Sequence, residues 1–91
     1  MKLFDWSDEK NDWLRAERGV TFEDVIFHLE RGDLLDTIEH PNRRQYPGQR
    51  LFIANMEGYA CIVPFVEDDK TIFLKTIISS RKMTNLYLKG D

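Results

Sequence analysis

The chain has few residues of the kinds that support secreted or membrane-spanning proteins. A single cysteine, Cys61, occurs in 91 residues, so an intrachain disulfide is excluded. Because Cys61 lies in an apolar run, we expect it to be a small buried core residue. No apolar run approaches the roughly 20 residues that cross a bilayer, and residues 1–6 lack the apolar stretch of a signal peptide. These absences predict a cytoplasmic protein that does not enter a membrane.

Residue patterns that hold metals or phosphate cofactors are missing as well. The two histidines, His28 and His40, are far apart and give no zinc pattern with one cysteine. The acidic residues 67–69 are contiguous in an expected turn, which favours a solvated hairpin over a metal site. There is no glycine-rich phosphate loop and no nucleophile elbow. We therefore expect neither a metal nor a cofactor.

The composition is that of a folded protein with an uneven charge distribution. Apolar residues make up 42% and charged residues 32% of the chain, which predicts one folded domain spanning residues 1–91. The net charge of −3 is divided into −6 for residues 1–39 and +3 for residues 40–91. A polyanion would be attracted to the second half, although the same numbers fit an ordinary solvated surface on each half.

The N-terminal third predicts a short strand and a first helix. Residues 2–5 fit an edge strand. Ser7 offers a helix N-cap, with acidic residues at positions 8 and 9 in the first turn. The helix should run to about Arg18, where Gly19 is a suitable C′ residue.

A second helix follows with stronger signals. Thr21 fits the N-cap and Asp24 the N3 position, which together form a variant of the capping box. Gly32 ends the helix. The i, i+3, i+4, i+7 spacing predicts that one face covers the core, and that face carries Phe22, Val25, Ile26 and Leu29.

The rest of the chain predicts a meander of strands. Residues 34–39 fit a short strand, and residues 40–49, with two prolines and a glycine, fit a loop. Strands are expected at 50–56 and 59–66, with a tight turn at residues 57 and 58 between them. Pro64 removes a ladder hydrogen bond, so we expect a bulge or a strand end there.

The C-terminal part predicts one more strand and a short helix. Residues 71–79 fit the last strand, after a hairpin turn at 67–70, with Ile72, Leu74, Thr76 and Ile78 on one face. Ser79 or Ser80 can cap a short helix through Tyr87. The predicted fold class is therefore α+β, with two N-terminal helices packed on a mainly antiparallel sheet and a short C-terminal helix.

Four segments in order resemble the BrnT family of small bacterial toxins. Residues 4–10 (Phe-Asp-Trp-Ser-Asp-Glu-Lys) are similar to its opening, and residues 18–24 (Arg-Gly-Val-Thr-Phe-Glu-Asp) to its Lys-His-Gly-Val-Ser-Phe-Glu-Glu. Residues 50–54 (Arg-Leu-Phe-Ile-Ala) resemble its Arg-Phe-Ile-Ala segment. The best match is at residues 77–87, which begin Ile-Ile-Ser-Ser-Arg-Lys-Met-Thr and end on a tyrosine.

The resemblance implies a RelE-like fold and a metal-independent endoribonuclease that inhibits translation and growth. It also implies a partner antitoxin of the ribbon-helix-helix type, similar to BrnA, in a toxin–antitoxin heterotetramer that contacts operator DNA only through the antitoxin. Arg18 stands where the family usually has histidine, the loop at 40–49 is longer and more basic, and the final helix is shorter. An alternative is therefore a catalytically inactive relative that keeps only the partner-binding surface.

Metal-free RNA cleavage needs a base for the 2′-hydroxyl, cations for the phosphoryl oxygens and an acid for the 5′-oxygen. Arg81, after the last strand, is the strongest candidate cation because an arginine fork binds phosphate in a bidentate way; the alternative is a surface arginine paired with Asp36 or Glu39. Arg50 and Lys75 could serve the same phosphate or simply mark solvent-facing positions. His40 suits acid–base work, or is a loop histidine without a role.

Further residues could bind RNA without taking part in cleavage. Lys10 and Arg18 could extend the phosphate-binding surface or pair with Glu9 and Glu17. Tyr87, like Tyr46, could stack on a base or, alternatively, anchor the last helix by packing. The predicted RNA-binding set comprises Lys10, Arg18, Arg43, Arg44, Lys82 and Tyr87.

Overall fold

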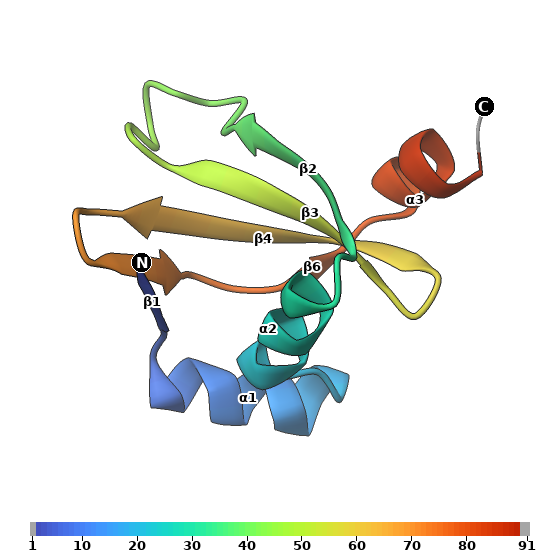
Figure 1. Ribbon diagram of the computed structural model, residues 1–91, viewed down its shortest axis with the longest axis horizontal. Helices are drawn as coiled ribbons and strands as arrows, with labels where there is room; N and C mark the ends of the chain where they lie inside the picture. Colours follow the sequence, from blue (N-terminus) through green and yellow to red (C-terminus); the bar gives the residue numbers. More distant parts are fainter. Residues whose placement is uncertain (1, 90–91) are drawn as a thin grey trace.

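The computed structural model describes residues 2–89 and confirms the α+β class (Figure 1). In chain order the elements are β1 (Leu3–Asp5), α1 (Asp8–Arg18), α2 (Phe22–Glu30), β2 (Leu34–Glu39), β3 (Arg50–Met56), β4 (Tyr59–Glu67), β5 (Thr71–Leu74), β6 (Ile78–Ser79) and α3 (Arg81–Leu88).

The six strands form one mixed sheet in the order β1-β5-β4-β3-β2, and β6 pairs with β4 beyond the end of β5. Every pairing is antiparallel except that of β1 with β5, which is parallel. The first strand, β1, therefore lies at the edge of the sheet next to β5. The predicted edge strand at the N-terminus is confirmed.

Both predicted helix starts have the expected caps. The Ser7 hydroxyl accepts the N–H of Lys10, and Gly19 ends α1 with φ 67°. Thr21 and Asp24 form the reciprocal capping box of α2. Each cap satisfies backbone donors that the first helical turn cannot bond internally, so these local signals place the helix ends within a residue of their predicted positions.

The sheet is covered on both faces, and side chains alternate between two hydrophobic clusters along β4. Cys61, Val63 and Phe65 pack with residues of α1 and α2, including the fully buried Leu14 and Phe22. Ala60 and Ile62 belong to a second, smaller cluster with residues of α3. Cys61 is a buried core residue, as predicted.

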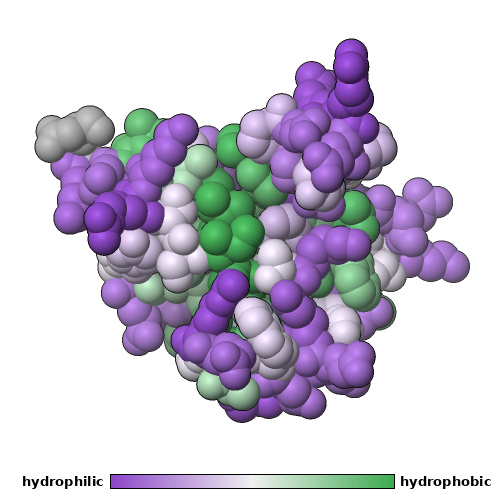
Figure 2. Space-filling view, turned by 180° about the vertical axis from the view of Figure 1, so that it is seen from behind, coloured by the Kyte–Doolittle hydropathy of each residue, from purple (hydrophilic) through white to green (hydrophobic). Residues whose placement is uncertain are grey.

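The small domain does not cover all of its apolar surface. Figure 2 shows the molecule from behind, with a hydrophobic area near the middle of the view bordered by hydrophilic side chains. Such exposure is expected in a chain of this size, because a short chain buries a smaller fraction of its surface than a large one. Within residues 2–89, no helix is long and apolar enough to cross a membrane.

The prediction that Pro64 ends or bulges β4 is wrong, because β4 continues to Glu67 and Pro64 pairs with Leu51 in regular register. The interruption falls instead on the neighbouring strand, the segment that pairs with β4 through Lys75. The Lys75 N–H donates to the Pro64 carbonyl at 2.8 Å, and Pro64 has no N–H to return that bond. Beside Pro64 the predicted strand at 71–79 is therefore divided into β5 and β6.

The division changes which side chains of this segment are buried. Leu74 is buried as predicted, but Ile77 is 1% exposed and Ile78 is 43% exposed. A continuous strand would have placed Ile78 on the same face as Leu74. Because residues 75–77 leave the regular ladder, the alternation shifts by one residue, and the predicted face is wrong at Ile78.

Candidate functional site

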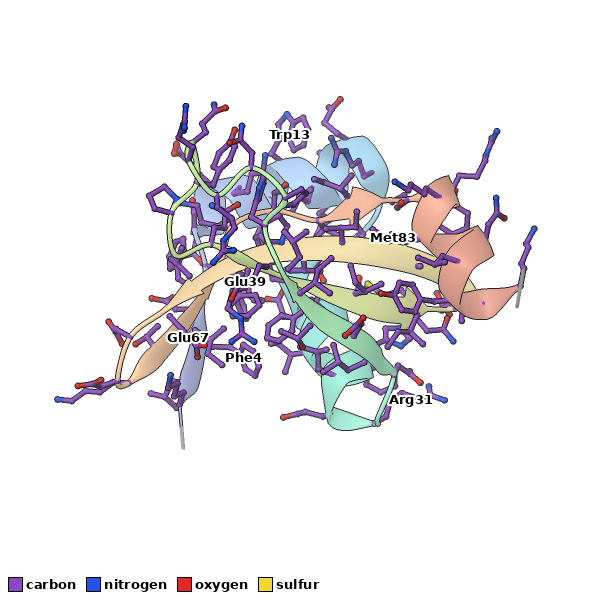
Figure 3. The ribbon with its side chains drawn as sticks, turned by 90° about the horizontal axis from the view of Figure 1, so that it is seen from above. Phe4, Trp13, Arg31, Glu39, Glu67 and Met83 are labelled. Atoms are coloured by element: carbon purple, nitrogen blue, oxygen red, sulfur yellow. The ribbon has the colours of Figure 1, made fainter. Side chains whose placement is uncertain are left out.

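The structure places the predicted catalytic residues at two ends of the sheet. Arg81 begins α3, directly after Ser80, whose N–H donates to the Ala60 carbonyl at 3.0 Å. Arg50 lies opposite Phe65, five residues further along β4, a separation of roughly 17 Å at about 3.4 Å per residue. Figure 3 shows the same division, with Met83 of α3 at one end and Glu67 toward the other.

Arg50 and Lys75 extend from opposite faces of the sheet. The Arg50 guanidinium lies 5.7 Å from the ring centre of Phe65, on the face that α1 and α2 cover. The Lys75 ammonium lies 5.8 Å from the ring centre of Phe73, whose strand neighbours Ile72 and Leu74 point toward α1 and α2. The two cations are therefore not brought to one phosphate.

Arg50 is held by a carboxylate. Its Nη1 lies 3.1 Å from Glu67 Oε1, and the Lys2 ammonium lies 2.8 Å from Glu67 Oε2. The hydrogen bond from Lys2, with the added attraction of Arg50, lowers the pKa of Glu67. Glu67 thus holds both cations in place, and Lys2, Arg50 and Glu67 together carry a net charge of +1.

His40 lies in the exposed loop between β2 and β3, with its ring centre 4.4 Å from that of Tyr46. Its Nδ1 accepts the backbone N–H of Asn42 at 3.0 Å. In the neutral imidazole the proton then resides on Nε2, so the outward nitrogen is a hydrogen-bond donor. In this arrangement neutral His40 can donate a hydrogen bond from Nε2 but offers no free lone pair to a 2′-hydroxyl.

Lys10 and Arg18 gather around Trp13 on α1. The Lys10 ammonium is 4.5 Å and the Arg18 guanidinium 5.0 Å from the Trp13 ring centre. Arg18 also donates from Nη1 to the Ile77 carbonyl at 2.7 Å, in the stretch between β5 and β6. Arg18 thus satisfies a carbonyl of the interrupted strand and ties the end of α1 to the sheet.

Tyr87 anchors α3. Its hydroxyl donates to Asp36 of β2 at 2.6 Å, and its ring packs in the second cluster with Met83. This hydrogen bond to the carboxylate favours the neutral phenol and raises the pKa of Tyr87. Because Asp36 is engaged by Tyr87, it is not the partner of Arg81.

The first turn of α3 has an unusual charge distribution. Helices α1 and α2 begin with acidic residues and carry basic ones in the last turn, as the helix dipole favours. Helix α3 instead begins with Arg81 and Lys82, both exposed, and has no acidic residue in its first turn. Two cations therefore add to the positive potential of the helix N-terminus, an arrangement that costs stability unless an anion is bound.

Most of the predicted site cations have no carboxylate partner among the described residues, a property that they share with Lys70 and Lys89. Among residues 2–89, the lysines and arginines within 4 Å of a carboxylate are Lys2, Arg15, Arg31 and Arg50. Arg50 is thus the only predicted site cation with such a partner in the described part of the chain. The seven that have none are Lys10, Arg18, Arg43, Arg44, Lys75, Arg81 and Lys82.

A hollow of about 450 Å³, which no sequence pattern predicted, lies on the side of the sheet that α1 and α2 cover. Its walls come from the turn between α1 and α2, from α2, from the tip of the β3–β4 hairpin and from β6. Cys61 and Ser79 contribute to its lining, and burial raises the pKa of the Cys61 thiol. In the described part of the chain, no group of three or more His, Cys, Asp or Glu side chains could hold a metal ion.

No protein-family model matches the chain, and no curated protein is significantly similar to it in sequence.

Proposed function

We propose that this protein is the toxin component of a type II toxin–antitoxin system, a metal-independent endoribonuclease that acts in the cytoplasm. The observation that carries the proposal is the cationic first turn of α3. Arg81 and Lys82 lie at the positive end of a helix, exposed and without a carboxylate partner among residues 2–89. The resemblance of residues 77–87 to the BrnT ending supports the same position.

In this proposal Arg81 binds the scissile phosphate. Its guanidinium is charged at every physiological pH and presents paired N–H donors that match two phosphoryl oxygens. Stabilising the negative charge that grows on those oxygens accelerates cleavage directly. His40, at the far end of the sheet, would contact another part of the RNA as a hydrogen-bond donor.

Arg81→Ala tests this role. We expect cleavage of single-stranded RNA, measured in the presence of EDTA, to fall by about 10²–10³-fold in kcat/KM, because a charge-stabilising donor is lost. Arg15→Ala is the matched control, because Arg15 is an exposed helical arginine paired only with Asp12. Equal activity of Arg81→Ala and wild type would contradict the role of Arg81, and intact RNA with the wild-type protein would contradict the ribonuclease itself.

A catalytically inactive, BrnT-like interaction domain is the second candidate. It is favoured by the separation of Arg81 from Arg50 and His40, because these three predicted catalytic residues do not share one site. In either case the proposed partner is a ribbon-helix-helix antitoxin in a heterotetramer. Harmless expression of the protein alone, together with co-purification of such an antitoxin encoded by the adjacent gene, would favour the second candidate over the first.

A further inference from the structure

The hollow on the α1–α2 side of the sheet is lined by both apolar and acidic side chains. Its apolar lining comes from Val20, Phe27, Met56 and Tyr59, and its carboxylates are Asp24 and Glu57. Among the described residues, the one basic side chain in its lining is His28, which is 7% exposed and has its Nδ1 2.8 Å from a carboxylate oxygen of Asp33. The hollow lies on the side of the sheet that carries α1 and α2, whereas α3 packs against the opposite face.

Large apolar side chains around this hollow are exposed to solvent. Phe27 is 58% exposed and Tyr59 is 39% exposed. Leu34, at 42%, pairs with Ala54 and so points to the same face as Met56, two residues along β3. A cavity surrounded by exposed aromatic and aliphatic side chains is the usual form of a protein docking site rather than of a closed core.

The carboxylates that line the hollow favour a cationic ligand over an anionic one. Of the arginines near the hollow, Arg31 pairs with the Asp33 carboxylate, and Arg18 keeps its charge but donates to the Ile77 carbonyl between β5 and β6. Arg31 also lies 5.4 Å from the Phe27 ring centre, which shows that this ring accepts a guanidinium by cation–π attraction. Two carboxylates and two partly exposed aromatic rings are together a suitable environment for a cationic side chain and unsuitable for a phosphate.

We propose that this hollow binds an arginine or lysine side chain, with a neighbouring apolar residue, presented by a partner polypeptide. The aromatic rings take the apolar part of the segment, and the carboxylates of Asp24 and Glu57 take its charge. This site is independent of the proposed ribonuclease function, because RNA would meet the cations of α3 on the other side of the sheet.

The test is an NMR titration of the ¹⁵N-labelled chain with two peptides. The first is acetyl-Gly-Leu-Arg-Leu-Arg-Gly-amide, and the second replaces both arginines with glutamate. We expect the basic peptide alone to bind, with amide shifts concentrated at Gly19, Asp24, Glu57, Tyr59 and Ser79. Equal binding of both peptides, or shifts concentrated on α3, would overturn the proposal.

Two variants test whether the Glu57 carboxylate and the Phe27 ring contribute to the affinity for the basic peptide. Glu57→Asn removes a carboxylate while suiting the positive φ of this turn position, so we expect a folded protein with about three- to fivefold weaker binding of the basic peptide. Phe27→Gln removes the exposed ring and should weaken binding similarly. Glu30→Gln, an exposed carboxylate on the same helix outside the hollow, is the matched control. Unchanged affinity in both Glu57→Asn and Phe27→Gln would also overturn the proposal.

Discussion

Asn11 joins the two N-terminal helices through bonds that an apolar residue could not make. Its Oδ1 accepts the N–H of Phe22 at 2.8 Å, and its Nδ2 donates to Glu23 Oε1 at 2.7 Å. The Asn11 side chain is 4% exposed and its bond to the Phe22 N–H is buried, whereas the bond to the exposed Glu23 is only partly shielded from water. The hydrogen bond from Asn11 is also the main reason that the pKa of Glu23 is lowered.

Replacing Asn11 tests this link. Asn11→Ala leaves the buried Phe22 N–H without an acceptor, and we expect the free energy of unfolding to fall by about 1–3 kcal/mol. Asp12→Ala, at the next and exposed position, should change it by no more than about 0.5 kcal/mol. Urea denaturation followed by circular dichroism measures both. A loss for Asn11→Ala no larger than that for Asp12→Ala would show that water replaces the bond.

Asn11 also shows why some structural residues are not predictable from this sequence. In the chain it is one polar residue among many in a helix with few apolar positions, and its partners lie 11 and 12 residues away in another helix. Cys61 was predictable because its own neighbours are apolar. A residue whose role depends on a distant partner carries no such local signal.

The β3–β4 hairpin provides a prediction at the scale of an element. Its two turn residues, Glu57 and Gly58, both have positive φ, at 59° and 89°. Two positive-φ residues between antiparallel strands form the turn type that favours Asn-Gly. Glutamate at the first position is strained, because left-handed backbone costs an ordinary side chain roughly 1–2 kcal/mol and asparagine less.

We therefore expect Glu57→Asn to stabilise the protein by part of that amount. Thermal unfolding at neutral pH is the measurement, with Glu57→Gln as the control that removes the charge without relieving the backbone. If the glutamine variant gains as much stability as the asparagine variant, the gain comes from charge and not from the turn.

At the same scale, the elements with local signals were predictable and their pairing was not. Helix caps such as Ser7 and Thr21 act through bonds to residues three positions away, so the sequence locates them. The effect of Pro64 was misplaced because its missing N–H faces another strand. The sequence shows that Pro64 cannot donate a backbone hydrogen bond, but it does not show which neighbouring strand is left without that bond.

The candidate site was predictable as a set of residue types and not as an arrangement. The basic character of Arg81 and Lys82 is readable in the chain, and the exposed first turn of α3 was implied by the Ser80 cap. The two-residue turn at 57 and 58 sets the register between β3 and β4, so the pairing of Arg50 with Phe65 follows from a local signal. The place of Ser80 beside Ala60 depends instead on the break between β5 and β6, which no local sequence signal indicates.

The whole molecule has titrating groups that limit its stability at both ends of the pH range. The pKa of Glu67 is lowered by Lys2 and Arg50, that of Glu23 chiefly by Asn11, and that of Asp68 by the N–H groups of Lys70 and Thr71. A lowered carboxylate pKa favours folding above the pKa of the unfolded chain, and this contribution is lost as the pH falls through the folded value. Stability should therefore decline below about pH 4.

At alkaline pH the sign is reversed. The pKa of Cys61 is raised by burial and that of Tyr87 by its bond to Asp36, so both favour folding while protonated. Their contribution is complete below the unfolded pKa values and is lost as the pH rises through the folded ones, above about pH 9.

Urea midpoints measured from pH 3 to 10.5 should form a plateau between these limits. Glu67→Gln should reduce the fall of the urea midpoint at acid pH and leave the alkaline fall unchanged. Tyr87→Phe should reduce the fall at alkaline pH and leave the acid fall unchanged. An equal change on both sides in either variant would mean that net charge, and not these specific contacts, sets the pH dependence.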